Sequence, residues 1–288
     1  MKIKISLVYI AIVLFLSAIV IWYINKPKYP EYISNMNISG LWKDSLGENI
    51  TIAFLDSGMH PDLVEIYGDR VVSPYDFVIE SEAMIDYNGH GTEMICIATC
   101  NYEDTGIYGI APKSEVMPLR IFDSNGDTTD ERIIEAIHYA VDNGADIINM
   151  SFGSYEDSIE VEEAIDYAIT NHVFVICSAG DLLNVATAFP ARYANTISVG
   201  NLVDFIDGVN YPDIDIFIYG EEIESLRYSE TQQFLVSKYE RGSSVSTAIL
   251  SGIIAIKIHN MSDSMRSVFL GYMIDRNTTY DLEDIVDY

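Results

Sequence analysis

Ile50-Thr51-Ile52-Ala53-Phe54-Leu55-Asp56-Ser57-Gly58 is the stretch that decides the fold of this 288-residue chain. Its first six residues are apolar or β-branched with almost no polar interruption, which is typical of a strand buried on both faces of a parallel sheet. The run ends in a carboxylate and a Ser-Gly pair. The stretch therefore predicts a buried parallel strand that delivers Asp56 at its carboxyl end.

Further runs of the same β-rich kind recur along the chain, and amphipathic segments separate them. The runs are residues 147–152, 173–177 and 196–200, and the amphipathic segments are residues 131–141 and 159–170. Thr129 or Asp130 is placed to cap the first amphipathic segment, and Gly144 to close it. Strand and helix in alternation predict an α/β fold, with a mainly parallel central sheet flanked by helices on both faces.

Polar motifs stand where such strands end and such helices begin. They are Asp56-Ser57-Gly58, Asn88-Gly89-His90-Gly91-Thr92 and Gly242-Ser243-Ser244-Val245-Ser246-Thr247-Ala248. Functional groups in an α/β sheet gather at the carboxyl ends of the strands. Each motif is weak evidence by itself, but together they bring an acid, an imidazole and a hydroxyl in the chain order Asp, His, Ser.

This constellation resembles the subtilisin-like serine peptidases, the subtilase family S8. Three further segments carry the likeness: residues 110–114, an Ala-Pro turn before a strand; residues 149–153, Asn-Met-Ser-Phe-Gly; and residues 189–200, Phe-Pro-Ala-Arg-Tyr through Ile-Ser-Val-Gly. The likeness covers about residues 48 to 260. It implies the subtilisin-like three-layer fold and the hydrolysis of peptide bonds.

The resemblance implies a role for each member of the triad. Ser244 is the expected nucleophile, at a helix start whose backbone N–H groups can hold an oxyanion. His90 is the expected base, which takes the hydroxyl proton and returns it to the leaving amine, while Asp56 fixes the imidazole tautomer. The chain is therefore expected to be a serine endopeptidase that works through an acyl-enzyme.

Asp181, in Ser178-Ala179-Gly180-Asp181, departs from the family, most of whose members have Asn at this oxyanion position. An amide donates a hydrogen bond to the oxyanion, whereas an ionised carboxylate repels it, and loss of that donor in subtilisin costs about 10²–10³ in kcat. A protonated Asp181 would donate much as Asn does. An Asp181 that rotates away would leave the Ser244 backbone N–H to act alone. The alternative of a weak enzyme, or of an inactive surface binding protein with this fold, therefore stays open.

Glu93 and Ala248 are two further departures from the family pattern. The family usually has His after His-Gly-Thr, where this chain has Glu93, and we expect that side chain to lie off the proton-transfer path. It usually has Pro where this chain has Ala248. The missing Pro could shift Ser244, and a misplacement of about 1 Å can cost about 10²-fold in rate.

Ser151, Phe152 and Gly153 form the segment that resembles the family's substrate-binding strand, which would pair its backbone with an extended peptide. No cofactor is required for this chemistry and no metal ligand is assigned. The family's calcium sites use carboxylates and carbonyls, and Asp123-Ser124-Asn125-Gly126-Asp127 is a conceivable loop of that kind, although the pattern is more typical of a solvated turn.

The charge of the chain restricts its partners. With 16 basic and 44 acidic residues the formal net charge is −28, which excludes a generic nucleic-acid binder because phosphate binding needs clustered Lys and Arg. A peptide or protein substrate, basic or neutral, is expected. The sequence does not indicate an oligomeric state. Cys96, Cys100 and Cys177 are too few for a disulfide framework and are expected to be buried thiols.

An uncharged apolar run, residues 7–24, follows Lys2 and Lys4 near the start of the chain. As a helix it would be about 27 Å long, close to the hydrocarbon thickness of a bilayer. It predicts a signal peptide or, since no small-x-small cleavage site follows, an uncleaved anchor. We therefore expect an anchor over residues 1–28, a linker or short pro-like segment over 29–48, and a peptidase domain over 49–288 that is membrane-anchored outside the cytoplasm or secreted.

Overall fold

The structure, a computed structural model, describes residues 14–17, 29–180, 187–206, 214–275, 280 and 282–287. The chain divides into two compact units, Met1–Glu31 and Tyr32–Tyr288. In the first unit, residues 14–17 are helical with exposed apolar side chains. Within the described ranges, no helix has both the length and the apolar character needed to cross a membrane. The predicted anchor, residues 7–24, lies outside the described residues apart from 14–17.

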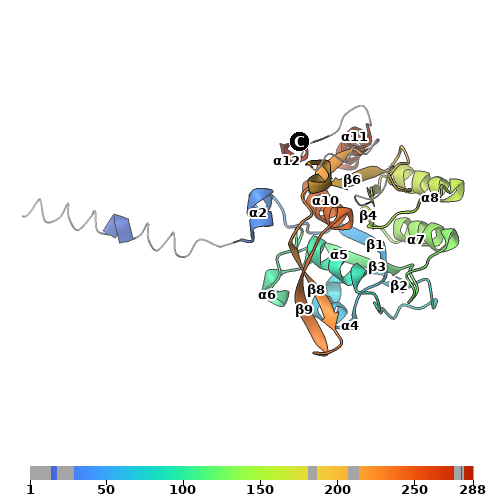
Figure 1. Cartoon of the computed structure of the whole chain (residues 1–288). Coiled ribbons are helices and arrows are strands. Elements are labelled where there is room, and N and C mark those ends of the chain that lie inside the picture. The colour runs from blue at the N-terminus through green and yellow to red at the C-terminus, as the bar shows by residue number, and fades with distance from the viewer. Residues whose placement is uncertain are drawn as a thin grey trace, which may run out of the picture. The chain divides into compact units, whose positions relative to one another are not determined.

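The second unit is built around a seven-stranded sheet in the order β2-β3-β1-β4-β5-β6-β7, with every neighbouring pair of strands parallel (Figure 1). The strands are β1 (Thr51–Asp56), β2 (Tyr75–Asp76), β3 (Glu115–Arg120), β4 (Ile147–Met150), β5 (Phe174–Ser178), β6 (Ile197–Asn201) and β7 (Ile216–Ile218). The four runs predicted from the sequence correspond to β1, β4, β5 and β6. The predicted α/β fold with a mainly parallel sheet is confirmed.

Helices cover both faces of this sheet. α5 (His90–Thr99) and α10 (Ser243–Ile258) lie on one face, and α7 (Asp130–Asp142) and α8 (Ile159–Thr170) lie on the other (Figure 1). The shorter or peripheral helices are α2 (Glu31–Asn35), α3 (Ile38–Leu41), α4 (Pro61–Tyr67), α6 (Tyr102–Thr105), α9 (Leu202–Ile206), α11 (Asp263–Met273), α12 (Leu282–Asp287) and a 3-10 turn at Gly68–Arg70. The architecture is therefore the three-layer one that the resemblance implies.

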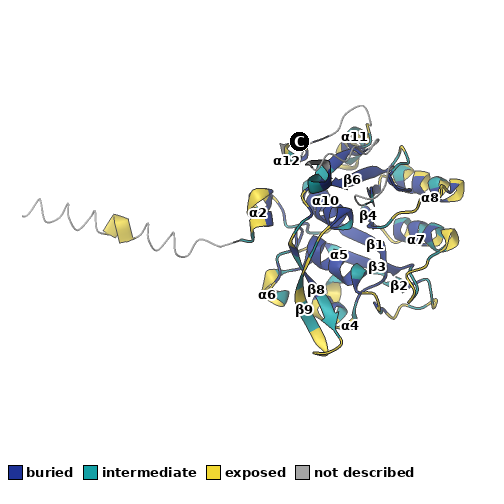
Figure 2. Cartoon of the chain, in the orientation of Figure 1, coloured by how far each residue is buried: buried dark blue, intermediate teal, exposed yellow. Residues whose placement is uncertain are grey.

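The two helical layers explain the sequence pattern of the strands. Every residue of β1 is buried, and Figure 2 shows the same for most of the central sheet, because a strand between two layers of helices has no solvent-facing side. The helix α7 begins after Thr129, whose side chain accepts a hydrogen bond from the backbone N–H of Arg132. Gly144, two residues beyond α7, has a φ of +82°, a left-handed conformation that glycine adopts readily.

A long antiparallel hairpin, which the sequence analysis did not predict, precedes α10. It consists of β8 (Ile223–Ser229) and β9 (Phe234–Glu240). β8 packs against α5, and β9 runs back toward the start of α10. The hairpin therefore contacts the helix that begins at His90 and leads into the helix that carries Ser244.

The segment expected to be a linker, residues 29–48, contains the helices α2 and α3. Tyr32, Ile33, Ile38 and Leu41 in these helices are buried. This segment is therefore folded, with buried apolar side chains, and is not an extended linker. The boundary at residue 49 stays a prediction.

Cys96 and Cys100 form a disulfide, so the expectation that both are thiols is wrong. Cys96 lies on α5, whereas Cys100 is the C-cap residue, with an extended ψ of 135°. Because the helix ends there, the two Cα atoms are 4.5 Å apart, within the range that a disulfide requires. Cys177 is buried on β5.

Candidate active site

Asp56 and His90 are in direct contact. Asp56 is the last residue of β1 and is almost fully buried. His90 Nδ1 lies 2.8 Å from Asp56 Oδ1 and 3.0 Å from Oδ2, and the backbone N–H of Ser57 donates to the same Oδ1 at 2.7 Å. An acidic side chain that holds Nδ1 in this way leaves the other ring nitrogen, Nε2, to act as a base.

The loop before His90 is held by a second carboxylate. Asp86 accepts hydrogen bonds from the backbone N–H groups of Asn88 and Gly89 through Oδ1, and from the N–H and hydroxyl of Thr92 through Oδ2. Asn88 in turn accepts from the backbone N–H of His90. These bonds fix the start of α5, and with it the backbone position of His90.

Gly91 permits the close approach of α5 to the end of β1. A Cβ atom at Gly91 would lie 2.2 Å from the carbonyl oxygen of Gly58, a distance that backbone atoms cannot tolerate. The backbone N–H of Gly91 also donates to the Ser57 hydroxyl at 2.9 Å. The motifs at 56–58 and 88–92 therefore form one packed unit.

Ser244 lies in the first turn of α10, after Gly242, whose φ is +117°. Its hydroxyl donates to the carbonyl oxygen of Ser151 at 2.8 Å, and the Ser151 hydroxyl donates to the carbonyl oxygen of Ser244 at 3.1 Å. In the first turn of a helix the backbone N–H groups have no intrahelical partner. The N–H of Ser244, the second residue of α10, therefore has no acceptor within the helix.

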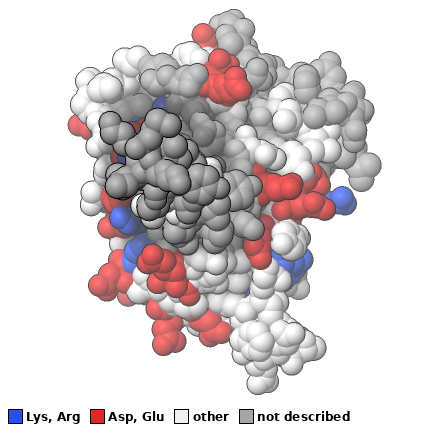
Figure 3. Space-filling view, turned by 90° about the vertical axis from the view of Figure 1, so that its left-hand side faces the viewer, with Lys and Arg blue, Asp and Glu red and all other residues white. Residues whose placement is uncertain are grey.

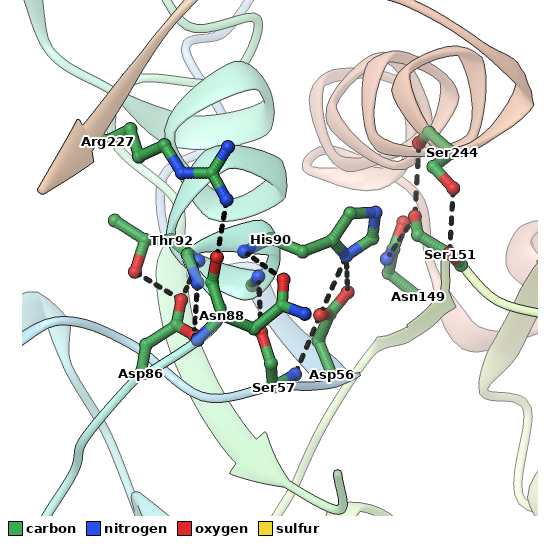
Figure 4. A network of polar contacts seen from close by, with 12 residues as sticks. Asp56, Ser57, Asp86, Asn88, His90, Thr92, Asn149, Ser151, Arg227 and Ser244 are labelled. Carbon is green, nitrogen blue, oxygen red and sulfur yellow. Dashed lines mark hydrogen bonds and ion pairs between the residues drawn. The ribbon is translucent and has the colours of Figure 1, made fainter. Parts of the chain in front are cut away.

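Figure 4 shows the imidazole of His90 between the Asp56 carboxylate and the Ser244 side chain. The ring presents Nδ1 to Asp56 and its other edge toward Ser244 in this view. In the part of the chain that the structure describes, the Ser244 hydroxyl bonds to Ser151 and not to His90. The structure thus pairs two members of the predicted triad, Asp56 and His90, whereas the Ser244 hydroxyl is turned to the predicted substrate-binding segment.

The electrostatic surroundings favour a charged imidazole. Burial lowers the pKa of His90, but the Asp56 carboxylate, its hydrogen bond and the more distant Glu93 and Asp86 raise that pKa to about 9. An imidazolium that forms when His90 accepts a proton would therefore be stabilised where it stands.

Asp181, the predicted oxyanion residue, lies outside the described residues, which stop at Gly180 and resume at Thr187. Its role as a donor therefore stays a prediction. Ser178, the last residue of β5, shares a hydrogen bond of 2.7 Å with the hydroxyl of Ser243. The strand end before residue 181 is thus held against the start of α10.

The predicted substrate-binding segment adjoins a cavity of about 330 Å³. Phe152 and Gly153 line it together with residues from the start of α7, from residues 154–161 and from Phe189 and Pro190. Three carboxylates, those of Asp130, Glu156 and Asp157, belong to this lining. The cavity therefore combines an apolar lining, which includes Ile133 and Val161, with these three carboxylates.

The conceivable calcium loop, residues 123–127, is held by one of its own carboxylates. Asp123 Oδ1 accepts hydrogen bonds from the backbone N–H groups of Asn125 at 2.8 Å and Asp127 at 3.0 Å, so this carboxylate closes a turn. Among the described residues, no group of three or more His, Cys, Asp or Glu side chains is placed to hold a metal ion.

Sequence reasoning missed several buried polar groups behind the site. Asn149 on β4 donates to the Ser151 hydroxyl at 2.9 Å and accepts from the Ser251 hydroxyl at 3.0 Å. Together with the Ser151–Ser244 pair, these bonds join β4 to α10. A polar residue inside an otherwise apolar strand was the available signal, because a buried amide needs partners.

An imidazole held by a buried carboxylate, near a serine at a helix start and above the carboxyl ends of parallel strands, is typical of serine hydrolases with a catalytic triad. The family model of the subtilase family matches residues 47–268, and the chain therefore belongs to the subtilase family.

Individual relatives agree with this assignment. The chain is 33% identical over 244 residues to the major intracellular serine protease of Bacillus subtilis (strain 168). The aligned region covers 79% of this chain and 74% of that protein. It is 34% identical over 227 residues to the thermophilic serine proteinase of Bacillus sp. (strain AK1), covering 74% and 53% respectively. It is 34% identical over 164 residues to thermitase of Thermoactinomyces vulgaris, covering 56% and 57%. The chain thus spans little more than half the length of the last two relatives.

Proposed function

We propose that this protein is a serine endopeptidase that hydrolyses peptide bonds through an acyl-enzyme on Ser244. The observation that carries the proposal is the contact of His90 Nδ1 with both carboxylate oxygens of Asp56, at 2.8 and 3.0 Å. Membership of the subtilase family and relatives named as serine proteases support a serine-protease function.

In the proposed reaction, the Ser244 hydroxyl turns from Ser151 to His90 Nε2, loses its proton to that nitrogen and attacks the peptide carbonyl carbon. The oxyanion that forms is held by the backbone N–H of Ser244. His90 then gives the proton to the leaving amine, and a water molecule, activated by the same nitrogen, hydrolyses the ester. Asp56 stays ionised throughout and stabilises the imidazolium.

The acidic cavity beside Phe152 supports a basic side chain as the preferred occupant. Asp157 is paired with Arg192 at 2.6 Å, whereas Asp130 and Glu156 form no ion pair with any residue that the structure describes. Two carboxylates are thus available to a cation. Acidic side chains are also spread over the face shown in Figure 3, with few basic ones among them, so the long-range field favours the approach of a basic peptide.

A serine-directed fluorophosphonate tests the proposal directly. We expect the full-length protein to be labelled at Ser244, and Ser244→Ala and His90→Ala each to abolish labelling. Ser264→Ala, which changes an exposed serine of α11, is the matched control and should label like the parent. A folded parent that is not labelled would contradict the proposal.

The second candidate function is a binding protein with the subtilase fold and no turnover. Two features favour it: a carboxylate at position 181 in place of an amide, and the Ser244 hydroxyl bonded to Ser151. This candidate predicts that peptides bind without being cleaved and that Asp181→Asn is not labelled either.

The place of the protein in the cell is a separate proposal that rests on the sequence. The apolar run at 7–24 supports a membrane anchor with the peptidase domain outside the cytoplasm, or a secretion signal. Protease added to intact cells should degrade an anchored domain, and deletion of residues 1–28 should release the protein from the membrane fraction. Retention of the full-length protein in the cytosolic fraction would overturn this proposal.

A further inference from the structure

Glu93 is a buried acid one helical turn after His90, and it faces two cations of the β8–β9 hairpin. Only 4% of its side chain is exposed. Its Oε1 lies 3.3 Å from Nε of Arg227 on β8 and 3.5 Å from Nζ of Lys238 on β9. Lys238 also pairs with Glu240 at 2.5 Å. We call Glu93, Arg227, Lys238 and Glu240 the hairpin cluster.

Two further bonds tie the hairpin to the helix that begins at His90. Arg227 Nη2 donates to the carbonyl oxygen of Asn88 at 2.6 Å, as Figure 4 shows, and the Ser225 hydroxyl donates to the carbonyl oxygen of Glu93 at 2.9 Å. Arg227 thus contacts the chain both two residues before His90 and three residues after it. The hairpin therefore contacts the segment that carries the expected base both before and after His90.

The other end of the hairpin cluster leads to the nucleophile. Glu240 is the last residue of β9, and Gly242 and Ser244 follow within four residues. The backbone N–H of Gly242 donates to the carbonyl oxygen of Gly220 at 2.9 Å, which fixes this short connection. One side of the hairpin thus holds the His90 segment, and its end joins the Ser244 helix.

We propose that Glu93 is a positioning residue for the reaction, which through the hairpin cluster holds the His90 segment and the approach to Ser244 as one rigid unit. This inference rests on the function proposed above. Glu93 touches neither the substrate nor the reacting atoms, so its effect passes through His90 and the hairpin.

The chemistry of the cluster supports this role. A buried carboxylate is costly unless it is paired, and removal of one member leaves the opposite charge uncompensated in a poorly solvated place. Burial and the Glu240 carboxylate raise the pKa of Glu93, Arg227 and Lys238 lower it, and the net result is a pKa of about 7. The charged groups that face Glu93 are therefore these three, together with His90 on its own helix. The ionised form of Glu93 is therefore stabilised by the two cations of the folded hairpin.

The first test is Glu93→Gln, which keeps the shape and removes the charge. We expect kcat on a peptide substrate to fall about tenfold, since displacements below 1 Å already cost rate, and KM to change less than about twofold. The limb of the pH profile on which kcat rises as His90 loses its proton should move to lower pH, because Glu93 is one of the carboxylates that raise the pKa of His90. Loss of thermal stability with kcat and the pH limb unchanged would overturn the proposal.

A surface variant guards against a folding defect. Arg227 is 39% exposed, so Arg227→Gln removes one cation of the hairpin cluster with less disturbance. It should lower kcat in the same direction, and Glu93→Gln/Arg227→Gln should lose less than the product of the single effects. Glu48→Gln is the control, since it removes an ion pair with Lys113 before the amino end of β1, far from the site. Multiplicative effects of Glu93 and Arg227 would contradict the proposal.

Amide hydrogen exchange tests the same inference without turnover. In Glu93→Gln, exchange should become faster by at least about fivefold in both the first turn of α5 and residues 223–240, and it should stay at the parent's level in β4 and β5. If exchange changes in this way in a protein that fluorophosphonate does not label, the hairpin cluster holds the two segments together and the proposed function is wrong. Unchanged exchange in both segments would overturn the proposed role of the hairpin cluster, whatever the activity of the variant.

Discussion

The Ser244 hydroxyl donates its hydrogen bond to the carbonyl oxygen of Ser151, 2.8 Å away. Ser151 opens the segment proposed to pair with an extended substrate, so the nucleophile and the substrate backbone compete for one acceptor. A peptide N–H that takes this carbonyl would release the hydroxyl toward His90. In the proposed function, occupancy of the Ser151 segment would therefore be coupled to the position of the Ser244 hydroxyl.

Asn149 supports this arrangement from inside the sheet, and its removal should be costly. In Asn149→Ala the hydroxyls of Ser151 and Ser251 each lose one hydrogen bond and keep another, to the carbonyl oxygens of Ser244 and Thr247. Two lost hydrogen bonds at about 0.5–1.5 kcal/mol each amount to about 1–3 kcal/mol. We expect a loss of unfolding free energy of this size in urea, together with a lower kcat. Asn143→Ala, at the exposed end of α7, is the matched control and should change the unfolding free energy by less than about 0.5 kcal/mol. Equal effects of the two variants would contradict this account.

The rate should rise with pH far into the alkaline range. His90 must be neutral to accept the Ser244 proton, and its pKa is raised to about 9. We therefore expect kcat/KM to increase up to about pH 9. This rise with pH should be absent in His90→Ala. A limb near the ordinary histidine value of about 6.5 would show that Asp56 does not hold the imidazolium in solution.

The same shift has a consequence for stability. A histidine whose pKa is raised on folding stabilises the folded state below its unfolded value of about 6.5, and that contribution is lost as the pH rises through about 9. The unfolding free energy of the parent relative to that of His90→Gln should therefore decrease as the pH rises from about 6.5 to about 9. A difference that is constant from pH 6 to 10 would contradict the raised pKa.

Asp181→Asn tests the oxyanion prediction. If position 181 points at the oxyanion, the amide should raise fluorophosphonate labelling at neutral pH by up to about 10²–10³, the range that one such donor contributes. Labelling of the parent should approach that of the variant at low pH, where a carboxyl group is protonated and can donate. Identical labelling rates at every pH would place residue 181 away from the oxyanion.

The acidic cavity should determine substrate choice. We expect Asp130→Asn/Glu156→Gln to lower kcat/KM for peptides with a Lys or Arg near the scissile bond by about tenfold and to leave apolar peptides within about twofold. Exposed Asp142→Asn, at the far end of α7, is the control, which removes one carboxylate away from the cavity. An equal loss for basic and apolar peptides would mean that the cavity carboxylates act on stability alone.

Arg120 and Asp76 form the most deeply buried ion pair among the described residues, at 2.7 Å with 3% and 0% of their side chains exposed. Arg120→Met would leave the Asp76 charge without compensation and should cost about 3–5 kcal/mol of unfolding free energy. Lys113→Met, which breaks an exposed pair with Glu48, should cost less than about 1 kcal/mol. Chemical denaturation of both variants decides this, and similar losses would contradict the burial argument.

Much of the fold was readable because it depends on local patterns. The runs that became β1, β4, β5 and β6 are buried on both faces, so burial alone makes them apolar and recognisable. The β8–β9 hairpin was missed for the opposite reason. Many of its residues are half-exposed, and apolar and polar side chains are mixed in it, as in Phe234–Glu240. Such a strand has no strong signature until its partner is known.

The sequence by itself determined the chemical groups of the candidate site: an acid at the end of β1, and an imidazole and a hydroxyl at helix starts. It also gives the carboxylate at position 181, whose part in the site stays a prediction. Residue types and their order along the chain carry that information. Only the tertiary structure decided that Asp56 holds His90, that the Ser244 hydroxyl bonds to Ser151, and that Glu93 meets Arg227 and Lys238. These pairs are separated by 34, 93, 134 and 145 residues, and contacts over such distances arise from packing of the whole sheet and its helices, which no local pattern encodes.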